Sequence, residues 1–165
     1  MATETTVLPE LSFDYLGAAK NSKDILADMS DSEIEDVAVR YRKFLLLKAK
    51  YPEQAVAPTE LIDAMWHLHM LHPVSYAGDC IALFGFILDH KPGVGATPET
   101  RPTLLKLFNR TAALWEAEFG EPYCVTGMRF HNVIICAEDD NEEEDKKKPQ
   151  PPKPPQPTPP SRFIG

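Results

Sequence analysis

A long, regularly spaced apolar pattern between residues 30 and 50 constrains the fold of this chain more than any other feature. Apolar side chains recur there at intervals of three and four residues, the period of one face of an α-helix. They are Ile34, Val37, Ala38, Tyr41, Phe44 and Leu45. Ser30 and Glu33 have the spacing of a capping box, with Ser32 as a rival N-cap, and Tyr51-Pro52 ends the pattern. The pattern predicts one helix of about five turns.

Two further observations refine this helix. Leu46 and Leu47 lie off the apolar stripe, so we expect the helix to be buried on more than one side. Lys48 falls on the stripe, but close to the end of the helix, where its long stem can reach water.

Proline and glycine divide the rest of the folded part into shorter helices. Pro58-Thr59-Glu60 predicts the start of a helix that ends at Leu71, because a residue before proline avoids the α region. Further helices are predicted at 73–83 and 102–119, with one or two short ones in 11–28. The apolar run at 133–136 is a short strand or an extended plug. The chain is therefore predicted to be all-α, a compact bundle of about four to six helices.

Composition separates this bundle, residues 10–136, from a tail at 137–165. Eight of the 16 prolines lie between Pro149 and Pro160, after a run that is mostly acidic and then basic. Such a segment cannot form a packed core, so we expect a disordered acidic and proline-rich tail. We also expect Phe84, Phe86, Ile87 and Leu88 to be buried in the bundle.

Charge and cysteine content narrow the classes of function. The net charge of −8 argues against binding to a phosphate backbone, so we expect no nucleic-acid partner. We expect no membrane partner either, because no apolar run reaches 18 residues, and the N-terminus lacks the pattern of a secretory signal. Three irregularly spaced cysteines favour a reduced, cytoplasmic location, with Cys124 and Cys136 as inert core thiols.

The residues that carry chemistry gather between positions 63 and 90. Four of the five histidines lie there, together with one of the three cysteines. At about 100° per residue, His67 and His69 point roughly 200° apart on one helix, so they cannot easily share one ion. Asp63 lies one turn before His67 and on its face. His69 is thus expected to face the next helix, which carries Tyr76, Asp79 and Cys80.

Three interpretations of this cluster remain open. The first is a zinc or iron site whose ligands come from His67, His69, Cys80 and His90, with Asp63, Tyr76 and Asp79 in supporting roles. The second is a set of buried, hydrogen-bonded side chains that locks a helical hairpin. The third is a cysteine-dependent enzyme in which a histidine activates Cys80. The spacing has neither CxxC nor HExxH, and the reaction is undefined.

The same residues resemble a known group, the glycine-rich domain-containing protein-like family. The resemblance covers about residues 34–120, and its motifs are Tyr41-Arg-Lys-Phe44, Pro58-Thr-Glu-Leu-Ile-Asp63, Trp66-His67-Leu-His69, Pro73, Tyr76, Asp79-Cys80, Leu83-Phe-Gly85 and Leu88-Asp-His90. It implies an all-helical domain and no assigned activity. The glycine-rich regions of plant relatives are absent here. Lys91 stands where many relatives have an aspartate, although Asp89 could substitute.

The end of the tail suggests an alternative function as a non-catalytic interaction module. A proline-rich spacer that ends in Phe163, Ile164 and Gly165 has the layout of a docking tag for a protein partner. This end resembles encapsulin cargo-loading peptides, but it lacks the Ser-Leu that usually follows. An unstructured end without a partner is the simpler interpretation of the same residues.

Overall fold

The computed structural model describes residues 7–91, 97–124, 129–130 and 133–134. It contains five helices in this part of the chain: α1 (Tyr15–Lys20), α2 (Asp31–Lys50), α3 (Glu60–Met70), α4 (Pro73–Phe84) and α5 (Arg101–Phe119). Two-residue strands β1 (Arg129–Phe130) and β2 (Val133–Ile134) pair antiparallel, so Val133 and Ile134 lie in a strand rather than a plug. The predicted all-α class is confirmed. The tail, and with it the predicted docking residues, lies outside the described residues.

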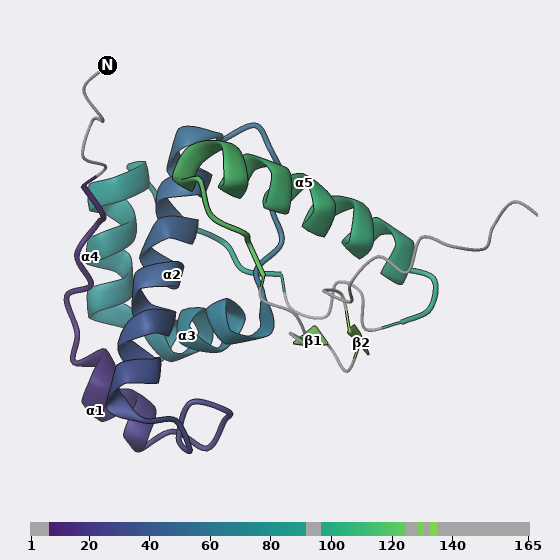
Figure 1. Ribbon diagram of the computed structural model, residues 1–165. Helices are drawn as coiled ribbons and strands as arrows, with labels where there is room; N and C mark the ends of the chain where they lie inside the picture. The colour runs from purple at the N-terminus through teal and green to yellow at the C-terminus, as the bar shows by residue number, and fades with distance from the viewer. Residues whose placement is uncertain (1–6, 92–96, 125–128, 131–132, 135–165) are drawn as a thin grey trace, which may run out of the picture.

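Helix α2 is the central element of the bundle (Figure 1). It contacts α1, α3, α4 and α5. The predicted capping box is present, because Ser30 and Glu33 bond to each other's backbone and side chain. Residues on several of its faces are buried, including Leu47 off the main stripe, so the expectation of burial on more than one side is confirmed.

Local chemistry sets the ends of the other helices near the predicted positions. Thr59 caps α3 by accepting a hydrogen bond from the Ile62 amide, and Pro73 begins α4. Gly85 and Gly120 end α4 and α5 with φ angles of 78° and 66°, the left-handed region that favours glycine. In the 11–28 region only α1 is helical among the expected short elements.

One expectation about the segment after α4 is wrong. Phe86 and Ile87 are exposed, with 57% and 58% of their surface accessible. The left-handed turn at Gly85 ends the helix and leads the chain past the bundle surface, so apolar character alone did not predict burial. The same turn returns the chain toward α3.

Helix α5 closes the bundle over the connection between α2 and α3. The Thr111 hydroxyl accepts a hydrogen bond from the Ala57 amide at 2.9 Å, and the Tyr123 hydroxyl donates to the Ala57 carbonyl at 2.7 Å. Lys50 pairs with Glu118 at 2.6 Å. These contacts fix the 51–58 connection, which forms one wall of the cavity described below.

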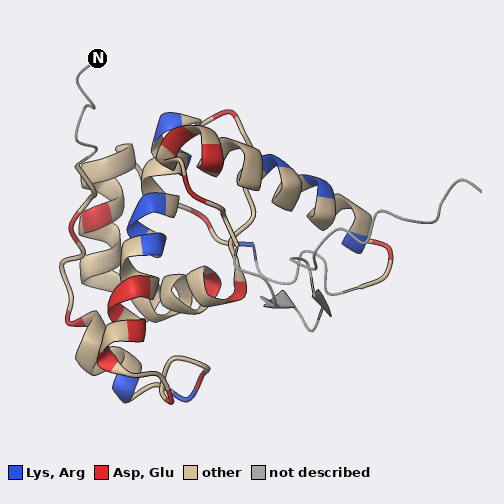
Figure 2. Cartoon of the chain, viewed as in Figure 1, with Lys and Arg blue, Asp and Glu red and all other residues tan. Residues whose placement is uncertain are grey.

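The charged residues of both signs are mixed over these helices (Figure 2). In this view α5 carries basic segments along its first half and acidic ones near its end. Among the described helices, none is both long and apolar enough to cross a membrane.

Candidate metal site and its cavity

Helix α3 presents two histidines to two different environments. His67 lies on the side of Asp63, and its Nδ1 atom is 3.8 Å from Asp63 Oδ2. His69 lies on the other side, where its Nε2 atom is 3.1 Å from Asp79 Oδ2 of α4. The two imidazoles therefore point in different directions from α3, as their spacing in the sequence predicted.

His90 joins Asp63 and His67 from the segment that follows α4. Its Nε2 atom is 2.8 Å from Asp63 Oδ1, and its ring lies 4.6 Å from the His67 ring between centroids. One ligand atom from each of the three residues lies within 4.8 Å of the others. Among the described residues, this is the group whose geometry can hold a metal ion.

Burial within this group, which we call the Asp63–His67–His90 triad, is graded. The His90 side chain is 7% exposed and that of Asp63 21%, whereas that of His67 is 44% exposed. An ionised carboxylate only accepts hydrogen bonds, so His90 Nε2–H donates to Asp63. Within the triad, His90 and Asp63 are thus largely covered by protein, whereas His67 is open to solvent.

A hydrogen-bond relay holds His90 in place. Trp66 Nε1–H donates to the Tyr76 hydroxyl at 2.9 Å, and that hydroxyl donates to the Leu88 carbonyl at 2.6 Å. Burial raises the pKa of Tyr76 to about 12, so its hydroxyl stays a donor well into the alkaline range. The Trp66 ring also meets the His90 ring edge to face, with centroids 4.4 Å apart. Tyr76 therefore acts on the site by positioning the backbone that carries His90.

The triad lies on the wall of a cavity of about 570 Å³. This volume is in the range of small-molecule sites, about 300–1,000 Å³. Its other walls come from the 52–58 connection, the 86–91 segment and α5, and they are largely apolar. The apolar lining residues include Val56, Ala57, Phe86, Leu88, Leu104 and Leu107.

Lys48 also lines this cavity, on the wall formed by α2. Its Nζ atom lies 5.5 Å from the centroid of the Trp66 ring and 5.7 Å from that of Phe44. Burial lowers the pKa of Lys48. No carboxylate among the described residues forms an ion pair with it. From the sequence we expected the long Lys48 stem to reach water. The sequence did not indicate that its ammonium would lie over two aromatic rings.

His69 belongs to a separate, buried cluster with Tyr41 and Asp79. It is 1% exposed, and its Nδ1 atom lies 3.0 Å from the Tyr41 hydroxyl. The Phe13 ring stacks on its imidazole at 4.8 Å with an interplanar angle of 6°. His69 Nε2 lies at ion-pair distance from Asp79 without hydrogen-bond geometry. Burial lowers the pKa of His69, and Asp79 opposes that shift in part, so the ring is neutral.

Asp79 ties this cluster to the N-terminal segment. Its Oδ2 atom accepts a hydrogen bond from the Ser12 amide at 2.8 Å, and the Ser75 hydroxyl donates to the Ser12 carbonyl at 3.1 Å. The cluster therefore fastens residues before α1 onto α3 and α4. This is the arrangement that the second interpretation of the sequence describes.

The structure thus divides the residues that the sequence analysis grouped. It brings His67 and His90 together with Asp63, and it places His69 and Cys80 outside that group. Asp63, expected in a supporting role, contributes a ligand-type oxygen. Its spacing of four residues from His67 was the available signal, because both side chains then share one helical face. Nothing local in the sequence indicated that Lys48 lines the same cavity.

The cysteines differ from one another. Cys80 is a free thiol that is 2% exposed, and it does not line the cavity beside the triad. Cys124 is disulfide-bonded, so the expectation of an inert free thiol at this position is wrong. Cys136 lies outside the described residues.

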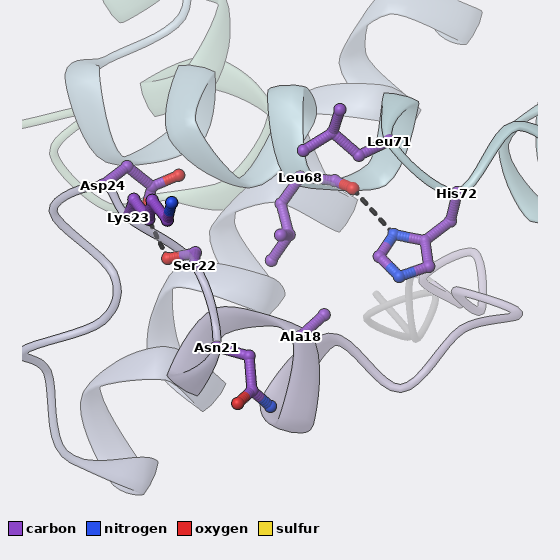
Figure 3. A pocket seen from close by; sticks show the side chains of 8 residues that line it. All are labelled: Ala18, Asn21, Ser22, Lys23, Asp24, Leu68, Leu71 and His72. Carbon is purple, nitrogen blue, oxygen red and sulfur yellow. Dashed lines mark hydrogen bonds between the residues drawn. The ribbon is translucent and has the colours of Figure 1, made fainter.

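A second cavity, of about 610 Å³, lies between the end of α1 and the end of α3 (Figure 3). His72 lines it, but His72 Nδ1 is 2.9 Å from the Leu68 carbonyl, and His72 belongs to no group of three metal-type ligands among the described residues. His72 is therefore a natural control for the triad.

Comparison with known proteins identifies the domain. Residues 9–79 match the model of the family described as glycine-rich domain-containing protein-like. Residues 9–79 therefore form a domain of this family. The resemblance predicted from the sequence is thereby confirmed, and the match includes α2, α3 and two members of the triad.

Two curated relatives come from Arabidopsis thaliana. Glycine-rich domain-containing protein 1 is 32% identical over 128 residues, which is 70% of this chain and 15% of that protein. Glycine-rich domain-containing protein 2 is 33% identical over 129 residues, 70% of this chain and 16% of that protein. The chain thus spans less than one-fifth of the length of these relatives. No solved structure matches it.

Proposed function

We propose that this domain binds a divalent transition-metal ion, zinc or iron, through Asp63, His67 and His90, on the wall of the cavity. The observation that carries the proposal is the approach of one oxygen and two imidazoles to within 4.8 Å of one another. Metal–ligand bonds of about 2.0–2.2 Å allow two ligands of one ion to be at most about 4.4 Å apart. A small side-chain adjustment is enough to gather all three atoms.

The ligand set supports both metals. Two histidines and one carboxylate form the ligand set of many catalytic zinc sites and of non-haem iron(II) sites. Three protein ligands leave positions for water or a substrate oxygen. In this chain the exposed side of His67 and the cavity give such a position access from solvent.

The surroundings also support a functional site. The Asp63 carboxylate and the His90 ring are fixed by the relay through Trp66, Tyr76 and Leu88, so two of the three ligands are held before an ion arrives. A metal ion would bind an imidazole nitrogen that carries no proton, so metal binding competes with protonation of the histidines and weakens at acidic pH. A purely structural set of side chains would not need an open cavity beside it.

The competing interpretations have less support among the described residues. Cys80 is buried and lines neither the cavity beside the triad nor the one between α1 and α3, which disfavours a cysteine nucleophile. A protein partner of the tail stays a prediction, since the tail is outside the described residues. The cytoplasmic location also stays a prediction, and the disulfide at Cys124 is not what a reducing compartment favours.

Elemental analysis of the full chain, purified without an affinity tag, tests the proposal. We expect zinc or iron at about one ion per chain, and equilibrium dialysis should return the same stoichiometry after removal and re-addition. His67→Ala, His90→Ala and Asp63→Asn should each weaken binding by at least tenfold.

Two control variants separate this site from other ligand sets. His72→Ala should leave metal content unchanged, because His72 lies in the second cavity. Cys80→Ala should also leave it unchanged, whereas a ligand set that includes Cys80, as the sequence suggested, predicts a loss. Trace metal in the wild type, or equal content in all variants, would overturn the proposal. Circular dichroism identifies any variant that is unfolded.

A further inference from the structure

The position of Lys48 beside the metal triad indicates what the cavity accepts. Resting on the function proposed above, we propose that the cavity binds a small monocarboxylate with an apolar body, and that Lys48 receives the carboxylate. The feature that carries this inference is the placement of one lysine ammonium over the aromatic rings of Phe44 and Trp66 in a mostly apolar cavity.

The environment of Lys48 favours an anionic ligand. A partly desolvated ammonium without a carboxylate partner is costly, because rings replace only part of its hydration. The other two lysines of α2 each have an acidic partner: Lys43 pairs with Glu121 and Lys50 with Glu118. Lys48 has no such partner among the described residues. An incoming carboxylate supplies the missing charge in a site of low polarity, where a charge-assisted hydrogen bond is strongest.

The other charged groups of the cavity limit the ligand to a single negative charge. Asp63 and Asp89 line the cavity together with the basic residues Lys48 and Lys91. A dianion would be repelled by the Asp63 and Asp89 carboxylates more strongly than a monoanion. A monocarboxylate carries the single charge that the Lys48 ammonium can balance over the aromatic rings.

Trp66 sets the distance that the ligand must span. Its ring lies 5.5 Å from Lys48 Nζ and 4.4 Å from the His90 ring. A molecule of a few bonds can therefore place its carboxylate at Lys48 and its far end near the triad. Leu104 and Leu107 of α5 provide an apolar surface for the body of such a molecule.

A matched pair of probes tests the inference on the full chain. Phenylacetate and its neutral analogue phenylacetamide have the same shape and differ in charge. Their affinities are measured by isothermal titration and ligand-observed NMR, with and without added zinc. Phenylacetate should bind at least tenfold more tightly than phenylacetamide.

Three variants assign that preference to one side chain. Lys48→Met keeps an apolar stem of similar length without the charge, and it should reduce phenylacetate affinity at least tenfold. Lys48→Arg keeps the charge and should remain within about threefold of wild type. Lys50→Met removes a charge from the same helix outside the cavity and should have no effect.

The outcomes distinguish this inference from the metal proposal. Zinc binding by Lys48→Met at wild-type affinity, with lost phenylacetate binding, supports both. Equal binding of the two probes, undetectable binding of phenylacetate by the wild type, or unchanged binding by Lys48→Met overturns the carboxylate site. A wild type that binds phenylacetate through Lys48 but no metal overturns the proposed function alone.

Discussion

The two histidine clusters of this domain contain similar side chains but differ in burial. In the cluster with Tyr41 and Asp79, the His69 imidazole is 1% exposed and stacked on Phe13. The triad also combines histidine with aspartate, but its His67 side chain is 44% exposed and faces a cavity.

Residue type alone therefore does not show whether a histidine cluster stabilises the fold or binds a ligand. His67 and His69 are two positions apart on α3, and the helix turns one toward the cavity and the other into the core. Where neighbouring side chains enclose a cluster, its removal costs stability. Where an open face remains, the same groups are available to a ligand.

The largest expected effect is a difference in stability between the two histidines. His69→Ala should lower the free energy of unfolding by about 3 kcal/mol, because it leaves a void beside Phe13 and an unpartnered hydroxyl on Tyr41. His67→Ala should cost less than about 1 kcal/mol, since its side chain is half in solvent. Urea denaturation measures both, and equal losses would contradict the division into two clusters.

Stabilisation by added zinc should depend on His67, the histidine whose removal costs less stability. Zinc at about 100 times its dissociation constant should stabilise the wild type by about 2.7 kcal/mol. The same zinc concentration should not stabilise His67→Ala, although that variant is folded. Thermal unfolding with and without zinc measures the gain. Stabilisation of His67→Ala by the full amount would place the ion elsewhere.

Much of the scaffold was predictable because it depends on neighbouring residues. The Ser30 and Glu33 capping box, the proline at the start of α4 and the glycines after α4 and α5 all act within one or two turns. The opposite directions of His67 and His69 follow from helix geometry in the same way. These features require no knowledge of distant contacts.

The composition of the site was less predictable because it depends on the path of the chain. His90 reaches Asp63 only because the turn at Gly85 brings the following segment back to α3. Lys48 meets the cavity only because α5 packs over the 51–58 connection and adds Leu104 and Leu107. Spacing could therefore nominate His69 and Cys80 as ligands, although the structure places both outside the triad.

A pair of tyrosine variants sharpens the comparison. Tyr41→Phe removes the partner of His69 Nδ1 and should cost about 1 kcal/mol of stability, with no change in zinc affinity. Tyr76→Phe removes the hydroxyl that holds the Leu88 carbonyl, so it should weaken zinc binding about tenfold as well as reduce stability. Equilibrium dialysis and urea denaturation on both proteins provide the test. Equal zinc affinity in the two variants would remove Tyr76 from the positioning relay.

The smallest effect concerns Lys48 in the cavity. Burial lowers the pKa of Lys48 below its ordinary value of 10.5, so the ammonium costs stability at neutral pH. Between the lowered value and 10.5 the unfolded chain binds more protons than the folded one, so this group makes stability rise with pH across that alkaline window. Lys48→Met should therefore stabilise the domain by about 1 kcal/mol near neutral pH and remove that rise. Lys50→Met is the control, and an equal gain there would show that net charge, rather than burial in the cavity, is responsible.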